Sequence, residues 1–306
     1  MKFSRQKILA EKILFIDGLS GSGKSLIGPL LVSLDKCEYW LYDHLYEEII
    51  VLLANKKIDL DSAKSILKIH SDMNIYNLYL GRNINFRYFD HSGVQYGSVE
   101  NNFKKRLRLK DGDYLVNKII KKKLWLPLMT HGVLIYFSLF KKIFSDRNIH
   151  FISLSRNPVS LLKNFYKDNW YYKINNNPRE IYLSYKKKKL HEPWFFALSK
   201  GNTFNDKYAD YLYKYINYQE KLKTSNHSII YYENFVRNPK KELDYLKQKL
   251  GSTNNITQKL FKKFKLPRIE KLSYEDDLNF INSKIKNRNL RYSLIKLQER
   301  YYNNLN

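Results

Sequence analysis

The chain has 306 residues, 43% of them hydrophobic, which is enough for one large α/β domain with a buried core. Its formal net charge is +26, and its single cysteine, Cys37, excludes a disulfide framework and a cysteine-based zinc site. No stretch reaches the roughly 18 to 20 apolar residues of a membrane span, and residues 1–11 do not resemble a signal peptide. We therefore expect a soluble, cytoplasmic protein.

Apolar runs of strand length alternate with helical patterns, which predicts a parallel sheet with crossover helices in one domain over residues 1–306. The expected strands are Lys12–Asp17, Glu38–Tyr42, Leu126–Met129, His150–Leu154 and Ser228–Tyr232. The expected helices are Ser25–Leu34, His44–Asn55, Asp61–His70, Val133–Phe144, Val159–Tyr166, Asp206–Leu222, Lys240–Leu250, Thr257–Phe264 and Leu290–Tyr302. The predicted fold class is α/β, with a P-loop-type parallel sheet flanked by helices.

Two segments are long for simple connections. Residues 45–122 exceed one crossover and predict a helical insertion, which is either a lid or acceptor-binding element or a structural cap. Residues 171–193 are rich in Lys, Asn and Tyr and predict a surface loop or flap. Aromatic clusters at 170–172 and 194–196 flank this segment, and their rings either stack on a sugar or belong to the core.

The positive charge also has two explanations. Lysines recur along the whole chain among many Asn, Ile and Tyr residues, which is typical of a genome with a strong base bias. We expect this bias to account for most of the charge, with an anion-binding site embedded in it. Because no DNA- or RNA-binding motif accompanies the lysines, no specific nucleic-acid partner is expected.

The first expected strand runs directly into a P-loop pattern, Gly18-Leu19-Ser20-Gly21-Ser22-Gly23-Lys24-Ser25. Glycines let several backbone N–H groups converge on one phosphate, the lysine adds a positive charge, and the next helix adds its positive dipole end. A loop without a ligand is the alternative. The residues expected to bind a nucleotide or another phosphorylated or sulfated group are Gly21, Ser22, Gly23, Lys24 and Ser25.

Two later segments carry further signals. The fourth strand ends at Arg156-Asn157-Pro158, so the guanidinium is expected at the carboxyl edge of the sheet, where it either grips a phosphate or pairs with a neighbouring helix. The fifth strand leads into Tyr232-Glu233-Asn234-Phe235, then Pro239 and Leu250-Gly251. Glu233 is expected to brace the loops around the site.

These three segments, in this order, resemble the sulfotransferases that use 3′-phosphoadenosine 5′-phosphosulfate (PAPS). The resemblance implies that PAPS is the donor, with Arg156 and Asn164 at its 3′-phosphate. Asn164 stands eight residues after the arginine, where the family usually has serine. Leu128-Met129-Thr130-His131 resembles the Lys-Thr-His segment that carries the base in many members.

This chain departs from the family in three ways. It has Asn164 where the family usually has serine, its P-loop has the kinase-like sequence Gly23-Lys24-Ser25, and no glycine-rich basic loop is evident late in the chain. We therefore interpret it as a divergent member.

The resemblance implies an in-line displacement at sulfur by a hydroxyl or amine, with Lys24 stabilising the developing charge and no metal required. His131 is the first candidate for the general base, and a structural histidine is the alternative. The other candidates are Glu38 and Asp43 on the second strand, and His91 in the expected insertion. The acceptor is unassigned, with a glycan or another small molecule as possibilities.

Two other functions compete with sulfuryl transfer. The P-loop also resembles that of adenylylsulfate kinases, which would need Mg²⁺ held by the P-loop Ser and an acidic strand end. Only Ile230-Tyr231-Tyr232-Glu233 ends in an acid among the later strands. A non-enzymatic nucleic-acid-binding protein is the third hypothesis, and salt-dependent binding without nucleotide affinity would support it.

Overall fold

The computed structural model describes residues 3–90, 92–97, 100–168, 183–185, 188–190, 203–254, 261, 266–267 and 272–305. The strands are β1 (Lys12–Gly18), β2 (Leu41–Tyr42), β3 (Trp125–Met129), β4 (Asn148–Ser155), β5 (Leu183–Tyr185), β6 (Lys188–Leu190) and β7 (His227–Tyr231). The α-helices are α1 (Lys24–Leu31), α2 (Leu45–Ala54), α3 (Leu60–Tyr79), α4 (Glu100–Lys104), α5 (Asp113–Lys122), α6 (Phe137–Ile143), α7 (Pro158–Asp168), α8 (Phe204–Lys221), α9 (Tyr232–Arg237), α10 (Pro239–Leu250), α12 (Tyr274–Lys284) and α13 (Arg288–Asn303). Three 3₁₀ turns are η1 (Val94–Gly97), η2 (Lys105–Arg108) and η3 (Val133–Tyr136).

Five strands form one parallel sheet in the order β2-β3-β1-β4-β7, which confirms the predicted fold class. β1 lies at the centre, and its residues Ile13 to Ile16 are fully buried. The chain leaves β1 toward β2 at one edge, returns through β3, and then crosses to β4 on the other side. Ligands of open α/β sheets bind at the carboxyl ends of strands where the chain reverses in this way.

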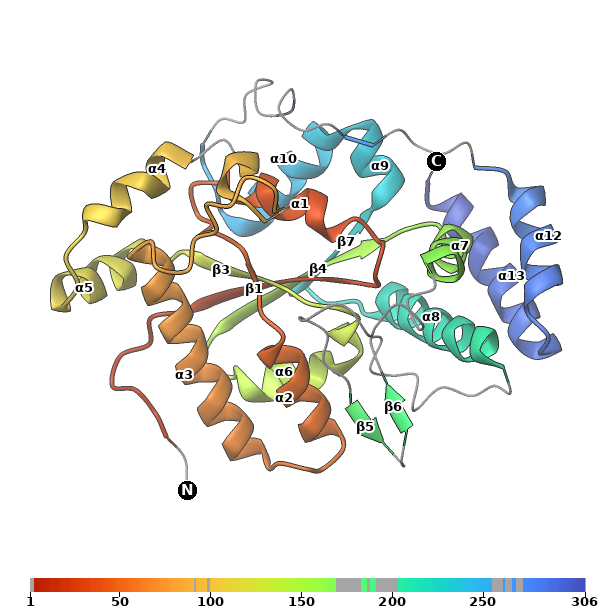
Figure 1. Ribbon diagram of the computed structural model, residues 1–306, viewed down its shortest axis with the longest axis horizontal. Helices are drawn as coiled ribbons and strands as arrows, with labels where there is room; N and C mark the ends of the chain where they lie inside the picture. The colour runs from red at the N-terminus through yellow and green to blue at the C-terminus, as the bar shows by residue number, and fades with distance from the viewer. Residues whose placement is uncertain are drawn as a thin grey trace.

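Helices cover both sides of this sheet (Figure 1). The ribbon shows α1, α9 and α10 on one side and α2, α3, α6 and α8 on the other, with α12 and α13 beside α7 and α8. The core beneath β1 is aromatic: the Phe15 ring lies 4.7 Å from Phe140 and 4.6 Å from Phe151, between ring centroids. This aromatic packing fixes the position of β1 and therefore the place where β1 ends.

The expected insertion, residues 45–122, contains α2, α3, α4, α5 and two 3₁₀ turns. Its longest helix, α3, packs on the body of the protein. Asp72 on α3 accepts hydrogen bonds from the backbone N–H groups of Leu9 and Ala10, and it forms a buried ion pair with Arg147 at 2.8 Å. α3 therefore supports the sheet.

Several expected elements differ from the structure. The helix expected at Asp61–His70 continues to Tyr79, because Ile75 and Leu78 extend its buried face. The strand expected at Glu38–Tyr42 is reduced to Leu41–Tyr42. Part of the expected surface loop at 171–193 pairs instead as the antiparallel strands β5 and β6. The helix expected at Thr257–Phe264 lies outside the described residues, except for Phe261.

None of the described helices is both long enough and apolar enough to cross a membrane.

Candidate functional site

The P-loop leaves the carboxyl end of β1 and turns into α1. Gly21 and Gly23 adopt positive φ angles of 79° and 98°, a region that residues with a side chain rarely occupy. A Cβ on Gly23 would also stand 2.5 Å from the ring of Tyr232. The sequence therefore places glycine where the backbone must turn tightly against a neighbouring ring.

The lysine and one serine of the loop are buried within it. Lys24 is 5% exposed, and its Nζ donates hydrogen bonds to the carbonyl oxygens of Gly18 (2.7 Å) and Leu19 (3.0 Å). Ser22 Oγ is buried and has no hydrogen-bond partner among the residues that the structure describes. Ser25 is exposed at the first turn of α1. An unsatisfied buried hydroxyl is costly, so this loop is suited to receive a polar ligand.

Arg156 lies against the P-loop, as the sequence led us to expect. Its Nη1 donates a hydrogen bond to the carbonyl oxygen of Gly21 at 2.8 Å, and its guanidinium lies 4.4 Å from the centre of the Tyr232 ring. Its Nε is buried without a hydrogen-bond partner in the described part of the chain. Asn164 is close by, because a Cβ built on Gly21 would lie 3.7 Å from its Nδ2. These groups bring a cation and an amide to one flank of the loop.

The turn that holds Arg156 is braced from behind. Asn157 caps α7 by accepting from Ser160 N at 2.8 Å, and its Nδ2 donates to Asp277 at 3.0 Å. Glu233 accepts from Asn157 N at 3.4 Å and from the hydroxyl of Tyr301. Burial raises the pKa of Glu233. Glu233 is thus a brace, as expected from the sequence, and it ties the Arg-Asn-Pro turn to the C-terminal helices.

The other flank of the P-loop is formed by the segment after β3. Thr130 N donates to Ile16 O at 3.0 Å, and Thr130 Oγ1 donates to Asp17 at 2.8 Å. A Cβ on Gly132 would lie 3.5 Å from the Leu19 side chain of the P-loop and would collide with the Tyr211 hydroxyl. His131, between these two residues, is therefore fixed at the carboxyl edge of the sheet next to the loop.

His131 is held by a buried carboxylate. Glu47 on α2, whose side chain is 1% exposed, accepts from His131 N at 2.8 Å and contacts His131 Nδ1 at 2.9 Å. The other ring nitrogen, Nε2, lies 3.3 Å from the hydroxyl of Tyr42. The His44 ring stacks 6.4 Å from the His131 ring. A carboxylate on Nδ1 fixes the ring's orientation and tautomer and directs Nε2 toward the Tyr42 side.

Other candidates for the base lie in different surroundings. Asp43 contacts His70 Nε2 at 2.6 Å and accepts from Asn74 at 2.9 Å. Burial alone would raise the pKa of Asp43, but the hydrogen bond and charge of His70, with the other hydrogen bonds, lower it overall. Asp43 is therefore suited to remain ionised. His91 lies outside the described residues.

Glu38 is not brought to the P-loop. It is fully buried and pairs with Arg106 at 2.7 Å. Its backbone N–H donates to the carbonyl oxygen of Trp125, the first residue of β3, which is paired with Lys12 at the start of β1. At ~3.3 Å per residue, the length of β1 puts the P-loop about 20 Å further along the sheet. Glu38 is therefore too far from the P-loop to act as a base there.

Sequence reasoning missed two groups, Glu47 and Asp17. Asp17 is the last residue before the P-loop glycine, and its buried carboxylate accepts from Thr130, Leu134 N and the hydroxyl of Tyr215. An acid at the end of a strand was a visible signal for it. Glu47 gave no such signal, because it is adjacent to Glu48 and far from His131 in the sequence. Within the described residues, no group of three or more His, Cys, Asp or Glu side chains is arranged to hold a metal ion.

The solved structures that are similar to this chain include two sulfotransferase domains. The sulfotransferase domain from the Synechococcus PCC 7002 olefin synthase aligns over 99% of this chain and 98% of its own length, with 14% identity and a TM-score of 0.47. The sulfotransferase domain from the curacin biosynthetic pathway aligns over 96% and 97%, with 15% identity and a TM-score of 0.45. No family model and no curated protein sequence matches the chain.

Proposed function

We propose that this protein is a sulfotransferase that moves a sulfuryl group from PAPS to a hydroxyl or amine of an acceptor. The observation that carries the proposal is the contact of Arg156 with the P-loop, at 2.8 Å from Nη1 to Gly21 O. This contact puts a guanidinium beside a phosphate-binding loop, which suits a nucleotide with anionic groups at two positions.

The donor fits the residues at this flank. The P-loop N–H groups and Lys24 would hold the 5′-phosphosulfate, and Arg156 with Asn164 would hold the 3′-phosphate. Two atoms of these residues, Ser22 Oγ and Arg156 Nε, are buried and have no hydrogen-bond partner among the described residues. Buried polar atoms without hydrogen-bond partners favour the binding of a ligand that forms hydrogen bonds with them.

The reaction that we propose is an in-line displacement. The acceptor oxygen or nitrogen attacks sulfur while the bond from sulfur to the phosphate oxygen breaks, and 3′-phosphoadenosine 5′-phosphate leaves. Lys24 stabilises the charge that develops on the leaving oxygen. A sulfuryl group carries less negative charge than a phosphoryl group, so this reaction needs no bound metal.

His131 is the proposed general base. Nδ1–H of His131 would donate a hydrogen bond to Glu47 at 2.9 Å, which keeps this proton on Nδ1 and leaves the lone pair on Nε2. That nitrogen would take the acceptor proton as the new bond to sulfur forms. The acceptor would enter on the side of Tyr42 and His44, whose side chains are partly exposed. A carbohydrate or another small molecule of the cytoplasm is the proposed class.

A P-loop kinase is the second candidate. It is favoured by the Gly23-Lys24-Ser25 wording and by the exposed Ser25, at the position whose hydroxyl holds Mg²⁺ in such kinases. The buried acid near the loop, Asp17, has both oxygens occupied by hydrogen bonds.

Thermal unfolding with different nucleotides separates the two functions. A ligand at one hundred times its dissociation constant stabilises the folded state by about 2.7 kcal/mol. We expect 3′-phosphoadenosine 5′-phosphate to raise the melting temperature without Mg²⁺, and ATP with Mg²⁺ to do so much less. A larger shift with ATP and Mg²⁺ would favour the kinase.

A further inference from the structure

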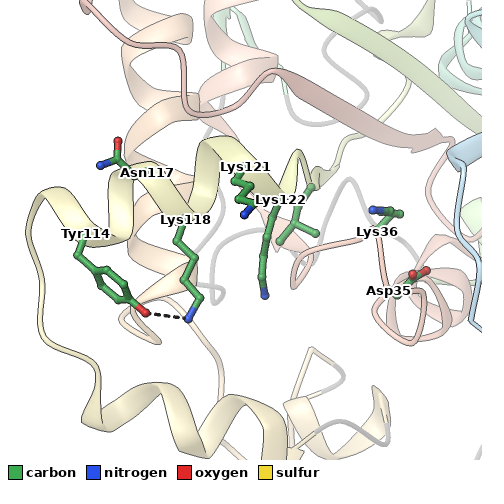
Figure 2. Close-up of a pocket in the computed structure, with 8 residues that line it drawn as sticks. Asp35, Lys36, Tyr114, Asn117, Lys118, Lys121 and Lys122 are labelled. Carbon is green, nitrogen blue, oxygen red and sulfur yellow. Dashed lines mark hydrogen bonds between the residues drawn. The ribbon is translucent and has the colours of Figure 1, made fainter.

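A concave site lies at the opposite end of the sheet from the P-loop. A groove of about 690 Å³ opens between α5 and the segment that contains Asp35 and Lys36 (Figure 2). Cys37, which follows this segment, forms an isolated parallel β-bridge through its backbone with Trp125 at the start of β3. The groove is therefore at the amino end of the sheet, whereas the P-loop follows the carboxyl end of β1. Its volume is within the range of sites for small ligands.

Lysines dominate the lining of this groove. Figure 2 shows Lys118, Lys121 and Lys122 along α5, with Lys36 on the facing segment. Within the described part of the chain, none of the four forms an ion pair with a carboxylate. Lys118 Nζ instead donates to the hydroxyl of Tyr114 at 3.3 Å, and this bond raises the pKa of Lys118.

The one acid in the lining faces elsewhere. Asp35 Oδ1 accepts from Ser252 Oγ at 2.6 Å and Thr253 N at 3.0 Å, while Oδ2 accepts from Thr253 Oγ1 at 3.0 Å. Burial alone would raise the pKa of Asp35, but these hydrogen bonds together lower it to about 2. Both carboxylate oxygens are engaged with residues outside the groove, so Asp35 does not pair with the lysines.

Helix stability explains only part of this arrangement. Lys121 and Lys122 lie in the last turn of α5, where cations interact favourably with the helix dipole. Lys118 is three and four residues before them, and like charges at these spacings destabilise a helix. Lys36 belongs to another segment altogether. The convergence of two segments on one concave site therefore points to a ligand rather than to α5 alone.

We propose that this groove binds a compact anion that carries two or more phosphate or sulfate groups. Ammonium groups act as point charges for such oxygens. The four lysines converge on one concave site rather than forming a stripe along an extended surface, which favours a compact anion over a nucleic-acid strand. This proposal does not depend on the reaction at the P-loop.

Calorimetric titration with inorganic tripolyphosphate at about 0.1 M salt tests the proposal. The test variant is the double substitution Lys36→Gln and Lys118→Gln. The matched control is Lys141→Gln with Lys142→Gln, which removes the same charge from exposed positions on α6, outside the groove. We expect about tenfold or greater weakening in the groove variant and little change in the control, with equal melting temperatures.

Two further titrations identify the site and the ligand class. A Lys24→Ala variant should keep the binding that depends on the groove lysines. Equal affinity of the groove and control variants, or loss of binding only in Lys24→Ala, would overturn the proposal. A single-stranded oligonucleotide that binds more tightly than tripolyphosphate, and loses affinity in the groove variant, would also overturn it, because the surface would then be one for nucleic acid.

Discussion

Replacing Arg156 with alanine tests the part of the site that distinguishes a 3′-phosphorylated nucleotide. The guanidinium donates to Gly21 O at 2.8 Å and stacks 4.4 Å from the Tyr232 ring. Both contacts shape the P-loop, so their loss should weaken every nucleotide. An additional charge-assisted bond to a 3′-phosphate would be worth about 1.5 to 3 kcal/mol. The substitution should therefore weaken 3′-phosphoadenosine 5′-phosphate about 10- to 150-fold more than AMP.

The assay is calorimetry with both nucleotides on the wild type and the variant. An effect on the loop that is common to both nucleotides cancels when the fold-loss of affinity for one nucleotide is divided by the fold-loss for the other. Lys163→Ala is the matched control: it removes one charge from α7, the helix that follows Arg156, and the Lys163 Nζ pairs with Asp277 at 3.2 Å rather than with the P-loop. The control should affect both nucleotides equally. Equal losses for both nucleotides in Arg156→Ala would refute the role that we assign to this residue.

Three further predictions concern the base, the loop and the fold. Glu47→Gln should lower kcat by roughly tenfold or more with little change in donor affinity, and it should have no further effect on kcat once His131 is alanine. Additive losses of kcat in the double variant would contradict the proposal that Glu47 acts through His131. Gly23→Ala should cost about 1 to 2 kcal/mol more stability than Gly251→Ala, because both glycines have positive φ but only a Cβ at the first meets a ring at 2.5 Å. Burial, with smaller repulsion from neighbouring cations, lowers the pKa of His150 from 6.5 to about 4. Stability from this group is therefore full above about pH 6.5 and falls below it, by about 2 kcal/mol at pH 5. Denaturant unfolding at pH 7.5 and pH 5 should show this loss, and His150→Gln should reduce it; an unchanged pH dependence in the variant would contradict the assignment.

The architecture was largely predictable because buried parallel strands read as apolar runs. β1, β3 and β4 are each buried over almost their whole length. The sequences of β1 and β3 are correspondingly apolar, whereas β4 also buries His150, Ser153 and Ser155. The P-loop and the position of Arg156 against it followed from the same logic, since both occupy carboxyl ends of neighbouring strands. Helix α5 was missed because only Leu115 and Ile119 are buried in it, among many lysines.

The surroundings of the candidate base were less predictable. Glu47 and His131 are 84 residues apart, and nothing local in α2 shows which of its two adjacent acids turns inward. The predicted position of Glu38 near the site was wrong for a related reason. The expected strand suggested that it lies near the site, but only Leu41 and Tyr42 reach the carboxyl edge. Such placements depend on the register of β2 against β3, which the sequence does not encode locally.

The central claim, that the P-loop and Arg156 together bind a PAPS-type nucleotide, is tested most directly by calorimetry on the unmodified protein. One titration uses 3′-phosphoadenosine 5′-phosphate without metal, and the other uses ATP with Mg²⁺. We predict that 3′-phosphoadenosine 5′-phosphate binds more tightly, and with the same affinity when Mg²⁺ is removed by a chelator. Mg²⁺-dependent binding of ATP with no preference for a 3′-phosphate would contradict the sulfotransferase proposal.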